Sequence, residues 1–319
     1  MSQTISIGMA TYNGATYLRE QLDSFANQTR LPDELVVSDD DSTDDTRAIV
    51  DDFARTAPFA VRLHVNARRL GYNRNFEHAI GLCTGDIVFI SDQDDRWFAR
   101  KIEMVVGLMD ARPDALVCTN DQSIVTADGT DTGATVLGRV RATGFDDDTF
   151  APGCCTAIRR SALPLLLPFP GDAVPYDHWI NIIPSLLGAR VLCEQPLQTY
   201  RRHATNTTGS LFARETLRPW SLATDALSSD AVKAYGAKIA GNALIADRLG
   251  SGQVDRLGLG DRRSRAIGAL ADESAAYTAR RDCIGLRRIA RIPHVMRMLR
   301  GGTYDRFHGL RSAVKDLVI

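Results

Sequence analysis

The chain has 319 residues, of which 44% are apolar and 24% are charged, and its formal net charge is −1. This length suits one large or two medium domains, and the near-neutral charge provides no overall field that would attract nucleic acid. No stretch reaches the roughly 20 consecutive apolar residues that a membrane-spanning helix needs, so the composition indicates an ordinary folded protein.

The first hundred residues alternate between strand-like and helix-like segments. Short apolar runs predict strands at residues 5–9, 34–38, 61–65 and 86–90, and the segments at 14–27, 43–54 and 73–82 have helical spacing. Thr43, followed by Asp44 and Asp45, is expected to begin the second of these helices. This alternation predicts a parallel α/β sheet.

The predicted elements are less regular between residues 97 and 200. We expect a helix at 97–111, strands at 116–120 and 122–126, and a turn at Asp128-Gly129. A helix interrupted by Pro184 is expected at 175–187, and a strand at 191–200.

After residue 210 the sequence has helical spacing, and its last forty residues are basic. Residues 280–319 contain ten Arg or Lys and three Asp, an excess of +7. One interpretation is an amphipathic basic helix that lies on an anionic membrane surface. The alternatives are a solvated face of a packed helix and a contact within a homodimer. The apolar residues interleaved with this charge are Leu286, Ile289, Ile292, Val295, Met298 and Leu299.

The cysteines and the N-terminus indicate the compartment. The six cysteines form no C-x-x-C pair, which argues against structural zinc and against a disulfide framework. The first residues carry no basic segment of the kind that begins a signal peptide. We therefore expect a cytoplasmic protein, with the inner face of the cytoplasmic membrane as the place of any surface contact.

Two acidic clusters follow predicted strands. Asp39, Asp40 and Asp41 come after the second strand, and the segment Asp92-Gln93-Asp94-Asp95 comes after the fourth. Because ligands of open α/β sheets bind at the carboxyl ends of the strands, both clusters are expected to face one crevice. Carboxylates suit Mg²⁺ or Mn²⁺, which would also offset the charge of a diphosphate ligand. The alternative for each cluster is a solvated surface turn.

Three segments carry a family resemblance, in this order: ATYNGATYLREQLDSFANQT, DELVVSDDDSTDDT and GDIVFISDQDDRW. Together they resemble the family 2 inverting glycosyltransferases with the GT-A fold, over residues 4–210. SDQDD-x-W, with a later Asp-x-Trp and Tyr-Arg-x-His, looks most like bacterial rhamnosyltransferases of surface polysaccharide synthesis. The resemblance implies a GT-A domain at 1–210, with a Rossmann-like mixed sheet flanked by helices, and a helical region at 211–319.

The resemblance implies roles for the first two motifs. Thr11 and Tyr12 are expected to line the nucleoside pocket, where Tyr12 either stacks on a pyrimidine or packs in the core. Asp40, helped by Asp39, is expected to accept a hydrogen bond from the pyrimidine N3–H. Family members carry Asp-Asp-Gly-Ser or Asp-Asp-Asn-Ser here, and Asp41 is a departure from that pattern.

The acidic cluster after the fourth strand has roles in donor and metal binding by the same resemblance. Asp92 is expected to contact the ribose or the sugar. Asp94 is expected to bind the metal, with Asp95 as the alternative ligand because the register of adjacent acids is ambiguous.

An inverting transfer also needs a general base for the acceptor hydroxyl. The segment PYDHWI, residues 175–180, matches the place where the family carries its base, which makes Asp177 the candidate. The alternative for Asp177 is a carboxylate that answers the dipole at a helix N-terminus. His178 and Trp179 are expected to contact the acceptor, and the alternative for Trp179 is core packing.

The last motif of the resemblance is TYRRHATNTTG, residues 199–209. Relatives carry a loop here that closes over the diphosphate. His203 is expected to complete the metal shell or contact phosphate, with a structural histidine as the alternative, and Arg201 or Arg202 is expected to offset phosphate charge.

The sequence therefore predicts a metal-dependent enzyme that moves a sugar, such as rhamnose, from a dTDP or UDP donor to a glycan or polyprenyl-linked acceptor. A nucleotidyltransferase of sugar phosphates is a competing hypothesis, but its Gly-rich, basic loop is missing after the first strand. A dinucleotide oxidoreductase lacks its G-x-G-x-x-G in the same place. A non-catalytic sugar-nucleotide-binding subunit is a third hypothesis.

Overall fold

The computed structural model describes residues 3–126, 128–143, 146–201, 231–307 and 309–318. The chain divides into two compact units, one of residues 1–142 and 146–208 and one of residues 143–145 and 209–319. The boundary predicted at residue 210 lies outside the described residues and stays a prediction. Among the described helices, none combines the length and the apolar character that crossing a bilayer requires.

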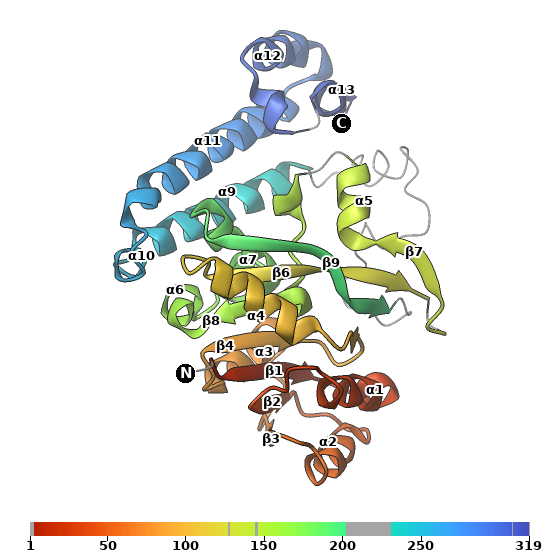
Figure 1. Ribbon diagram of the computed structural model, residues 1–319. Helices are drawn as coiled ribbons and strands as arrows, with labels where there is room; N and C mark the ends of the chain where they lie inside the picture. Colours follow the sequence, from red (N-terminus) through yellow and green to blue (C-terminus); the bar gives the residue numbers. More distant parts are fainter. Residues whose placement is uncertain (1–2, 127, 144–145, 202–230, 308, 319) are drawn as a thin grey trace. The chain divides into compact units, whose positions relative to one another are not determined.

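In the described part of the first unit, nine strands form one sheet in the order β3-β2-β1-β4-β8-β6-β9-β5, with β7 beside β6 (Figure 1). β1 to β4 are parallel, whereas β8 is antiparallel to both β4 and β6. The sheet is thus mixed. The strands are β1 (Ile5–Thr11), β2 (Glu34–Asp39), β3 (Ala60–Val65), β4 (Ile87–Ser91), β5 (Arg96–Trp97), β6 (Val117–Val125), β7 (Asp131–Thr135), β8 (Thr156–Arg159) and β9 (Arg190–Arg201).

Helices cover both faces of the parallel strands. The crossovers of β1 to β2 and of β2 to β3 run one way along the sheet, and the crossover back to β4 runs the other way. Right-handed crossovers therefore put α1 (Ala15–Ala26) and α2 (Thr46–Ala54) on one face and α3 (Tyr72–Leu82) on the other. Gly8 of β1 allows α3 to approach closely, because a Cβ there would lie 3.3 Å from Cys83 Sγ.

The main core lies between the strands and the face that carries α1 and α2, where α4 (Lys101–Ala111) also packs. β1, β2 and β4 are buried almost throughout, as expected of parallel strands covered on both faces. Core residues include Ile5, Ile7, Met9, Leu18, Leu22, Phe25, Leu35, Val37, Val50, Ile102, Val105 and Met109.

Several element boundaries differ from the sequence-based expectation. The second helix begins at Thr46 rather than Thr43, because Thr43 N–H donates to Asn13 Oδ1 and Asp44 accepts from the backbone of Thr46. Residues 96–97 pair with β9 instead of beginning a helix. Two expected strands form the single β6, whose register is irregular around Asp121.

The remaining elements of the first unit are short, apart from α7. They are α5 (Val136–Ala142), η1 (Asp147–Thr149), η2 (Gly153–Cys155), η3 (Arg160–Ala162), α6 (Leu163–Leu166), η4 (Gly171–Ala173) and α7 (Tyr176–Leu186). Pro184 lies inside α7 without ending it.

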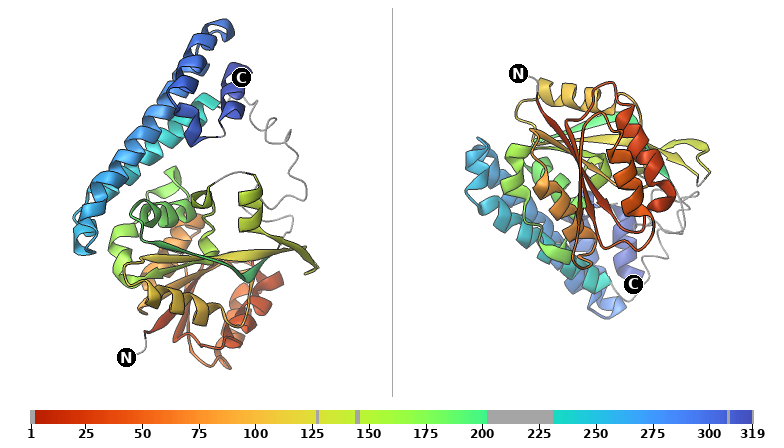
Figure 2. Two further views of the ribbon diagram at one scale, coloured as in Figure 1. Left: turned by 45° about the horizontal axis from the view of Figure 1, so that its top comes forward. Right: turned by 90° about the horizontal axis from the view of Figure 1, so that it is seen from below.

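The described part of the second unit is helical, as the sequence predicted. α9 (Ala231–Gly250) and α11 (Gly260–Ile284) lie side by side and are joined through α10 (Gln253–Arg256) (Figures 1 and 2). The expected basic helix is broken into the end of α11, then α12 (Arg288–Arg300), η6 (Thr303–Arg306) and α13 (Leu310–Val318). Arg280 and Asp316 form an ion pair (2.7 Å) in the interior of the second unit. The charge of Arg280 is therefore neutralised within the unit.

Candidate active site

The carboxyl ends of β1, β2 and β4 meet at one edge of the sheet. β1 pairs in parallel with β2 on one side and with β4 on the other, so the strand order reverses here. Thr11 lies opposite Asp39 at the last register position of β1 and β2, and Asp92 follows β4 directly. Ligands of open α/β sheets bind at such a switch point. The two acidic clusters therefore follow strands on either side of β1.

Side chains from these strand ends join the loops that follow them. Thr11 Oγ1 donates to Asp39 Oδ2 (2.9 Å), and Asn75 Nδ2 donates to the carbonyl of Thr11 (3.2 Å). The Tyr12 N–H donates to Gln93 Oε1 (2.9 Å), and Gln93 Nε2 donates to the Tyr12 carbonyl (3.2 Å). Gln93 therefore fastens the loop after β1 to the loop that carries Asp92 and the acids after it.

Asp39 is fully buried and serves as a hydrogen-bond hub. Its carboxylate accepts from the backbone and hydroxyl of Ser42 and from Arg47 Nε (2.8 Å). Burial alone would raise the pKa of Asp39, but the hydrogen bonds from Ser42 and Arg47 outweigh it and lower the pKa. Asp39 is therefore ionised, and it holds the ends of β1 and β2 together.

Asp40 is 3% exposed and organises the segment before α3. Its Oδ1 accepts from Leu70 N–H (2.6 Å) and Asn66 Nδ2 (3.2 Å), and its Oδ2 accepts from Gly71 N–H (2.9 Å). The predicted hydrogen bond from a nucleobase to Asp40 stays a prediction. A nucleobase bound there would donate to carboxylate oxygens that already accept hydrogen bonds from Asn66, Leu70 and Gly71.

The departure at Asp41 has a structural reason. Asp41 has φ +63, in the left-handed region where Gly, Asn and Asp are best tolerated. The Gly or Asn of the family motif and the Asp of this chain thus meet one backbone requirement. Arg47 Nη2 donates to Asp41 Oδ1 (2.9 Å).

Tyr12 stands at the surface of the site rather than in the core. Its side chain is 37% exposed, and the guanidinium of Arg69 lies 4.0 Å from the centre of its ring. The flat guanidinium of Arg69 therefore lies over the Tyr12 ring. A nucleobase, which is also flat, could lie over an aromatic ring in the same way.

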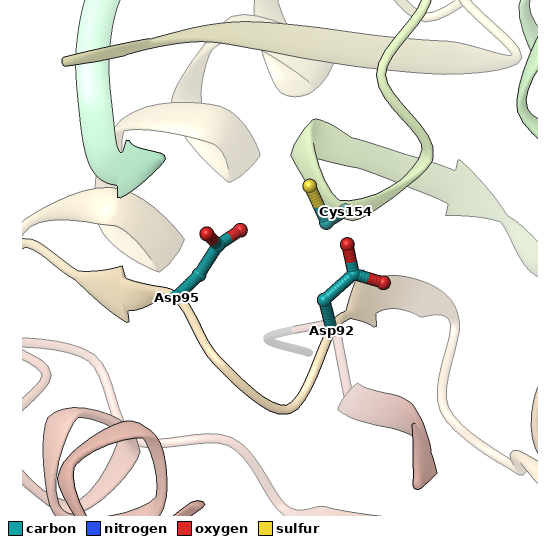
Figure 3. Close-up of side chains that lie close together, drawn as sticks. All are labelled: Asp92, Asp95 and Cys154. Carbon is teal, nitrogen blue, oxygen red and sulfur yellow. The ribbon is translucent and has the colours of Figure 1, made fainter. Parts of the chain in front are cut away.

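Among the described residues, Asp92, Asp95 and Cys154 form a group that could hold a cation (Figure 3). One ligand atom from each lies within 4.8 Å of those of the other two. Both acids come from the loop between β4 and β5, and Cys154 comes from η2, which faces that loop (Figure 3). The group includes Asp95, the alternative metal ligand of the sequence interpretation, and does not include Asp94.

The protonation of this group depends on burial. Burial, followed by the charge of Asp94, raises the pKa of Asp95 to about 7. Burial and the charges of Asp94 and Asp95 also raise the pKa of Asp92 well above its usual range. The contact with Cys155 and burial raise the pKa of the Cys154 thiol.

These residues fit a hard divalent ion. Mg²⁺ and Mn²⁺ prefer oxygen ligands and commonly take one or two carboxylates together with substrate phosphate oxygens. Asp92 and Asp95 offer such carboxylates from one loop. The Cys154 thiol, whose pKa is raised, stays protonated near neutral pH and is a poor ligand for these ions. The clustered negative charge of the two acids is itself costly unless a cation offsets it.

Asp177 lies in the first turn of α7 and is partly buried. Burial raises the pKa of Asp177, against the hydrogen bond that its Oδ1 accepts from the His178 N–H (2.7 Å). Its charge also contributes to raising the pKa of Asp92. Asp177 thus belongs to the same electrostatic cluster as the acids after β4, although it follows them by more than eighty residues in sequence.

Trp179 does not provide the acceptor surface expected of it. Its side chain is 1% exposed, and its Nε1 donates to the carbonyl of Leu166 (2.8 Å). An indole that is covered on all sides cannot stack on a sugar, so Trp179 is a core residue that anchors α7. His178 is partly exposed, and its acceptor role stays a prediction.

Arg201 is likewise engaged within the chain. It is 7% exposed, its Nη2 pairs with Glu20 Oε2 (2.6 Å), and its guanidinium lies 4.9 Å from the ring centre of Tyr17. This ion pair already neutralises the charge predicted to face phosphate. His203 and Arg202 lie outside the described residues, and their roles stay predictions.

Three buried residues of this region were missed by the sequence interpretation, namely Cys154, Lys101 and Gln198. Gln198 Nε2 donates to Asp95 Oδ2 (2.7 Å), and Lys101 Nζ donates to Gln198 Oε1. The available signal was Lys101, one of four lysines in the chain, placed six residues after the second acidic cluster.

Comparison with known proteins gives a family match over half of the chain. A family model described as Glycosyl transferase family 2 matches residues 6–166. An uncharacterized protein of Mycobacterium tuberculosis (strain H37Rv) is 28% identical over 206 residues, or 63% of this chain and 59% of that protein. The chain thus spans less than two thirds of the length of this relative.

Two relatives with described activities match the chain over shorter stretches. The dTDP-rhamnosyl transferase RfbG of Shigella flexneri is 33% identical over 105 residues, which are 32% of this chain and 36% of RfbG. The abequosyltransferase RfbV of Salmonella typhimurium is 31% identical over 121 residues, 37% of this chain and 36% of RfbV.

Among solved structures, Staphylococcus aureus TarS (residues 1–349) in complex with UDP-GlcNAc has a TM-score of 0.56. The sequences are 17% identical, over 77% of this chain and 66% of that one. At this identity the likeness concerns the fold.

Proposed function

The chain belongs to glycosyl transferase family 2 and has the GT-A fold predicted from its sequence, and on this premise we propose that it is an inverting glycosyltransferase. It passes a sugar from a nucleoside-diphosphate donor to an acceptor hydroxyl. The observation that carries the proposal is that the acids after β4 follow a strand paired with β1, at the edge where β1 and β2 also end, and that the charge of Asp177 acts on Asp92.

The strand ends bind and orient the donor. Tyr12 offers a partly exposed ring to the nucleobase, and Thr11 and Asp39 keep the loops beneath it in place. Asp92 and Asp95 would hold Mg²⁺ or Mn²⁺ together with diphosphate oxygens. When bound, the ion offsets negative charge on the leaving diphosphate.

Asp177 acts as the general base. Its carboxylate takes the proton of the acceptor hydroxyl while that oxygen forms a bond to the anomeric carbon. The bond from this carbon to the diphosphate oxygen breaks on the opposite face, and its electron pair leaves with the nucleoside diphosphate. A partly buried carboxylate with a raised pKa is a stronger base than a solvated one, which suits this step.

The donor sugar is proposed from the relatives. The names of RfbG and RfbV describe the transfer of rhamnose from dTDP and of abequose, so we place this chain among transferases of deoxysugars. Rhamnose on dTDP or UDP is the proposed donor. The proposed acceptor is a glycan, free or linked to a polyprenyl diphosphate, in cell-surface polysaccharide synthesis.

The test of the reaction is Asp177→Asn, with Asp110→Asn on the exposed face of α4 as control. Removal of a general base typically costs about 10²–10⁴-fold in turnover, so Asp177→Asn should lose kcat while donor Kd stays within about twofold. Asp110→Asn should keep both. If Asp177→Asn turned over as fast as the wild-type protein, Asp177 would not be the base. If the wild-type protein bound the donor but showed no turnover, a non-catalytic subunit would be favoured.

The donor and the ion are identified by thermal shift. Nucleoside diphosphates and nucleotide sugars are screened with and without Mn²⁺, because a ligand of the folded state raises the Tm. We expect dTDP and UDP to stabilise the protein more with Mn²⁺ than without it. Equal shifts in EDTA would show that the acids after β4 bind no ion with the donor.

We also propose that the second unit contacts an anionic membrane surface. α12 exposes Ile289 (84%), Ile292 (53%) and Met296 (45%), and α13 exposes Leu310 (68%) and Val314 (51%). Exposed arginines at 287, 288, 297 and 300 accompany the α12 residues, whereas Arg280 and Arg291 are buried. Apolar residues beside cationic ones suit the headgroup region of anionic lipid.

Vesicle sedimentation tests this contact. The protein should sediment with phosphatidylglycerol vesicles and remain in solution with phosphatidylcholine vesicles. Ile289→Ser with Ile292→Ser should weaken the anionic binding, whereas Val232→Ser, at an exposed position of α9, should not. Equal sedimentation with both kinds of vesicle would contradict a contact with anionic lipid. A dimer that is lost in the variant with Ile289→Ser and Ile292→Ser would assign these residues to a homodimer contact instead.

A further inference from the structure

Lys101 is a buried cation beside the acids that follow β4. It is the first residue of α4 and is 1% exposed. Its Nζ donates to the Cys154 carbonyl (3.1 Å) and to Gln198 Oε1, and it lies 3.8 Å from the ring centre of Trp97. A lysine ammonium is costly to bury, so a site that keeps one there is expected to use its charge.

Lys101 determines how the Gln198 amide is oriented. An amide has one oxygen that accepts and one nitrogen that donates, whereas the ammonium can only donate. With Oε1 facing Lys101, the Nε2 of Gln198 must face Asp95, and it donates to Oδ2 at 2.7 Å. Gln198 is fully buried, so no water competes for this amide.

From this geometry we infer that Lys101 and Gln198 position Asp95 for a divalent ion. Gln198 donates to one carboxylate oxygen of Asp95, and a carboxylate oxygen of Asp95 lies within 4.8 Å of ligand atoms of Asp92 and Cys154. Lys101 fixes Gln198 and places a positive charge behind two acids that repel each other. The inference depends on the proposed function, since it assigns these residues to the ion site of that reaction.

Cys154 is connected to the same pair. Lys101 holds the carbonyl of Cys154, and the side chain of Cys154 is itself 3.5 Å from Gln198 Nε2. The two residues therefore link α4, β9 and η2, three elements that are far apart in sequence, around Asp95. Residues that orient a metal ligand typically change metal affinity by about 10- to 100-fold when they are removed.

The test compares Lys101→Met and Gln198→Ala with Gln28→Ala. Gln28 is a buried amide at the same end of α4, where its Oε1 accepts from the Ile102 N–H (3.1 Å), so it controls for damage to the helix. The readouts are the Kd of Mn²⁺ from electron paramagnetic resonance of the free ion, with and without UDP, and the Tm without ligand.

We expect Lys101→Met and Gln198→Ala each to raise the Kd of Mn²⁺ by about tenfold or more, and the double variant to be no worse than the stronger single one. Gln28→Ala should lower the Tm and leave the Kd unchanged. Methionine fills the volume of the lysine stem but leaves Gln198 Oε1 and the Cys154 carbonyl without this donor, so a lower Tm is expected for Lys101→Met.

Two different failures can be distinguished. Mn²⁺ binding by both variants as in the wild type, or an equal loss in Gln28→Ala, would overturn the positioning role and leave the proposed function intact. Absence of Mn²⁺ binding by the wild-type protein, even with UDP, would overturn both. If Lys101→Met does not fold, Gln198→Ala decides the outcome.

Discussion

Gly14 lies where the loop after β1 meets the loop after β4, and its replacement by alanine tests whether this junction matters for donor binding. A Cβ at residue 14 would lie 2.2 Å from Gln93 Oε1. Gly14 has φ −100, which alanine adopts without strain, so the collision with Gln93 is the main consequence of the change. Gln93 is a flexible side chain and will move away.

The cost follows from the two hydrogen bonds that Gln93 makes with the Tyr12 backbone (2.9 and 3.2 Å). Each hydrogen bond contributes about 0.5–1.5 kcal/mol net. At this exposed position the loss of both should therefore cost about 1–2 kcal/mol of the free energy that holds the two loops in the donor-binding arrangement. We expect the Kd of the donor to rise by about 5- to 30-fold in Gly14→Ala. The Tm should fall by only a few degrees, because the core is untouched.

A double-mutant cycle checks the mechanism by calorimetry of donor binding. Gln93→Ala should match Gly14→Ala, and the double variant should add nothing, because both changes remove the same two hydrogen bonds. Gly81→Ala is the control, since a Cβ there meets no atom within 4 Å. Additive losses in the double variant, or wild-type donor affinity in Gly14→Ala, would refute the reasoning.

Three further predictions concern stability and pH. Burial opposes the ionisation of Glu34, but hydrogen bonds from Ser6, Thr84 and Arg62 lower its pKa from 4.5 to about 2. This stabilisation is present above the unfolded pKa and is lost as the pH falls toward 2, so Glu34→Gln should cost up to about 3 kcal/mol at pH 7 and little at pH 2 in urea unfolding. Gly153→Ala places a Cβ 2.1 Å from the hydroxyl of the fully buried Tyr176. The resulting overpacking should destabilise the fold by about 1–3 kcal/mol and lower the Tm in calorimetry. An unchanged Tm would contradict this prediction. The raised pKa of Asp177 predicts that kcat/KM falls with decreasing pH at a higher pH than for a solvated aspartate, and a pH profile without this limb would remove Asp177 as the base.

The sequence was sufficient where local patterns determine structure. Continuous apolar runs predicted the parallel strands around β1, because strands buried on both faces have few polar residues. Since those strands are parallel, the acids that follow β2 and β4 had to reach the same edge of the sheet. The position of Asp41 in the motif also reflects a local requirement, its φ of +63.

Helix ends and side-chain exposure were less predictable. Thr43 looked like a helix start, but its N–H bonds to Asn13, thirty residues away. Trp179 and Arg201 have chemistry suited to sugars and phosphates, yet each is buried against partners supplied by other elements. The basic C-terminal segment breaks after α12 at Gly301 and Gly302, where Gly302 has φ +70, and Asp316 of α13 then accepts hydrogen bonds from Arg280 and Tyr304, contacts that the helical spacing does not reveal.

The sequence by itself determined which parallel strands are followed by acids and the family to which the chain belongs, because both depend on short contiguous segments. The tertiary structure alone decided that Asp95 rather than Asp94 joins Asp92, and that Cys154, Lys101 and Gln198 surround it. These residues come together through η2 and β9, which lie about 60 and about 100 residues, respectively, from the acids in the chain. Contacts of this kind depend on how distant segments pack, and packing leaves no periodic trace in the sequence.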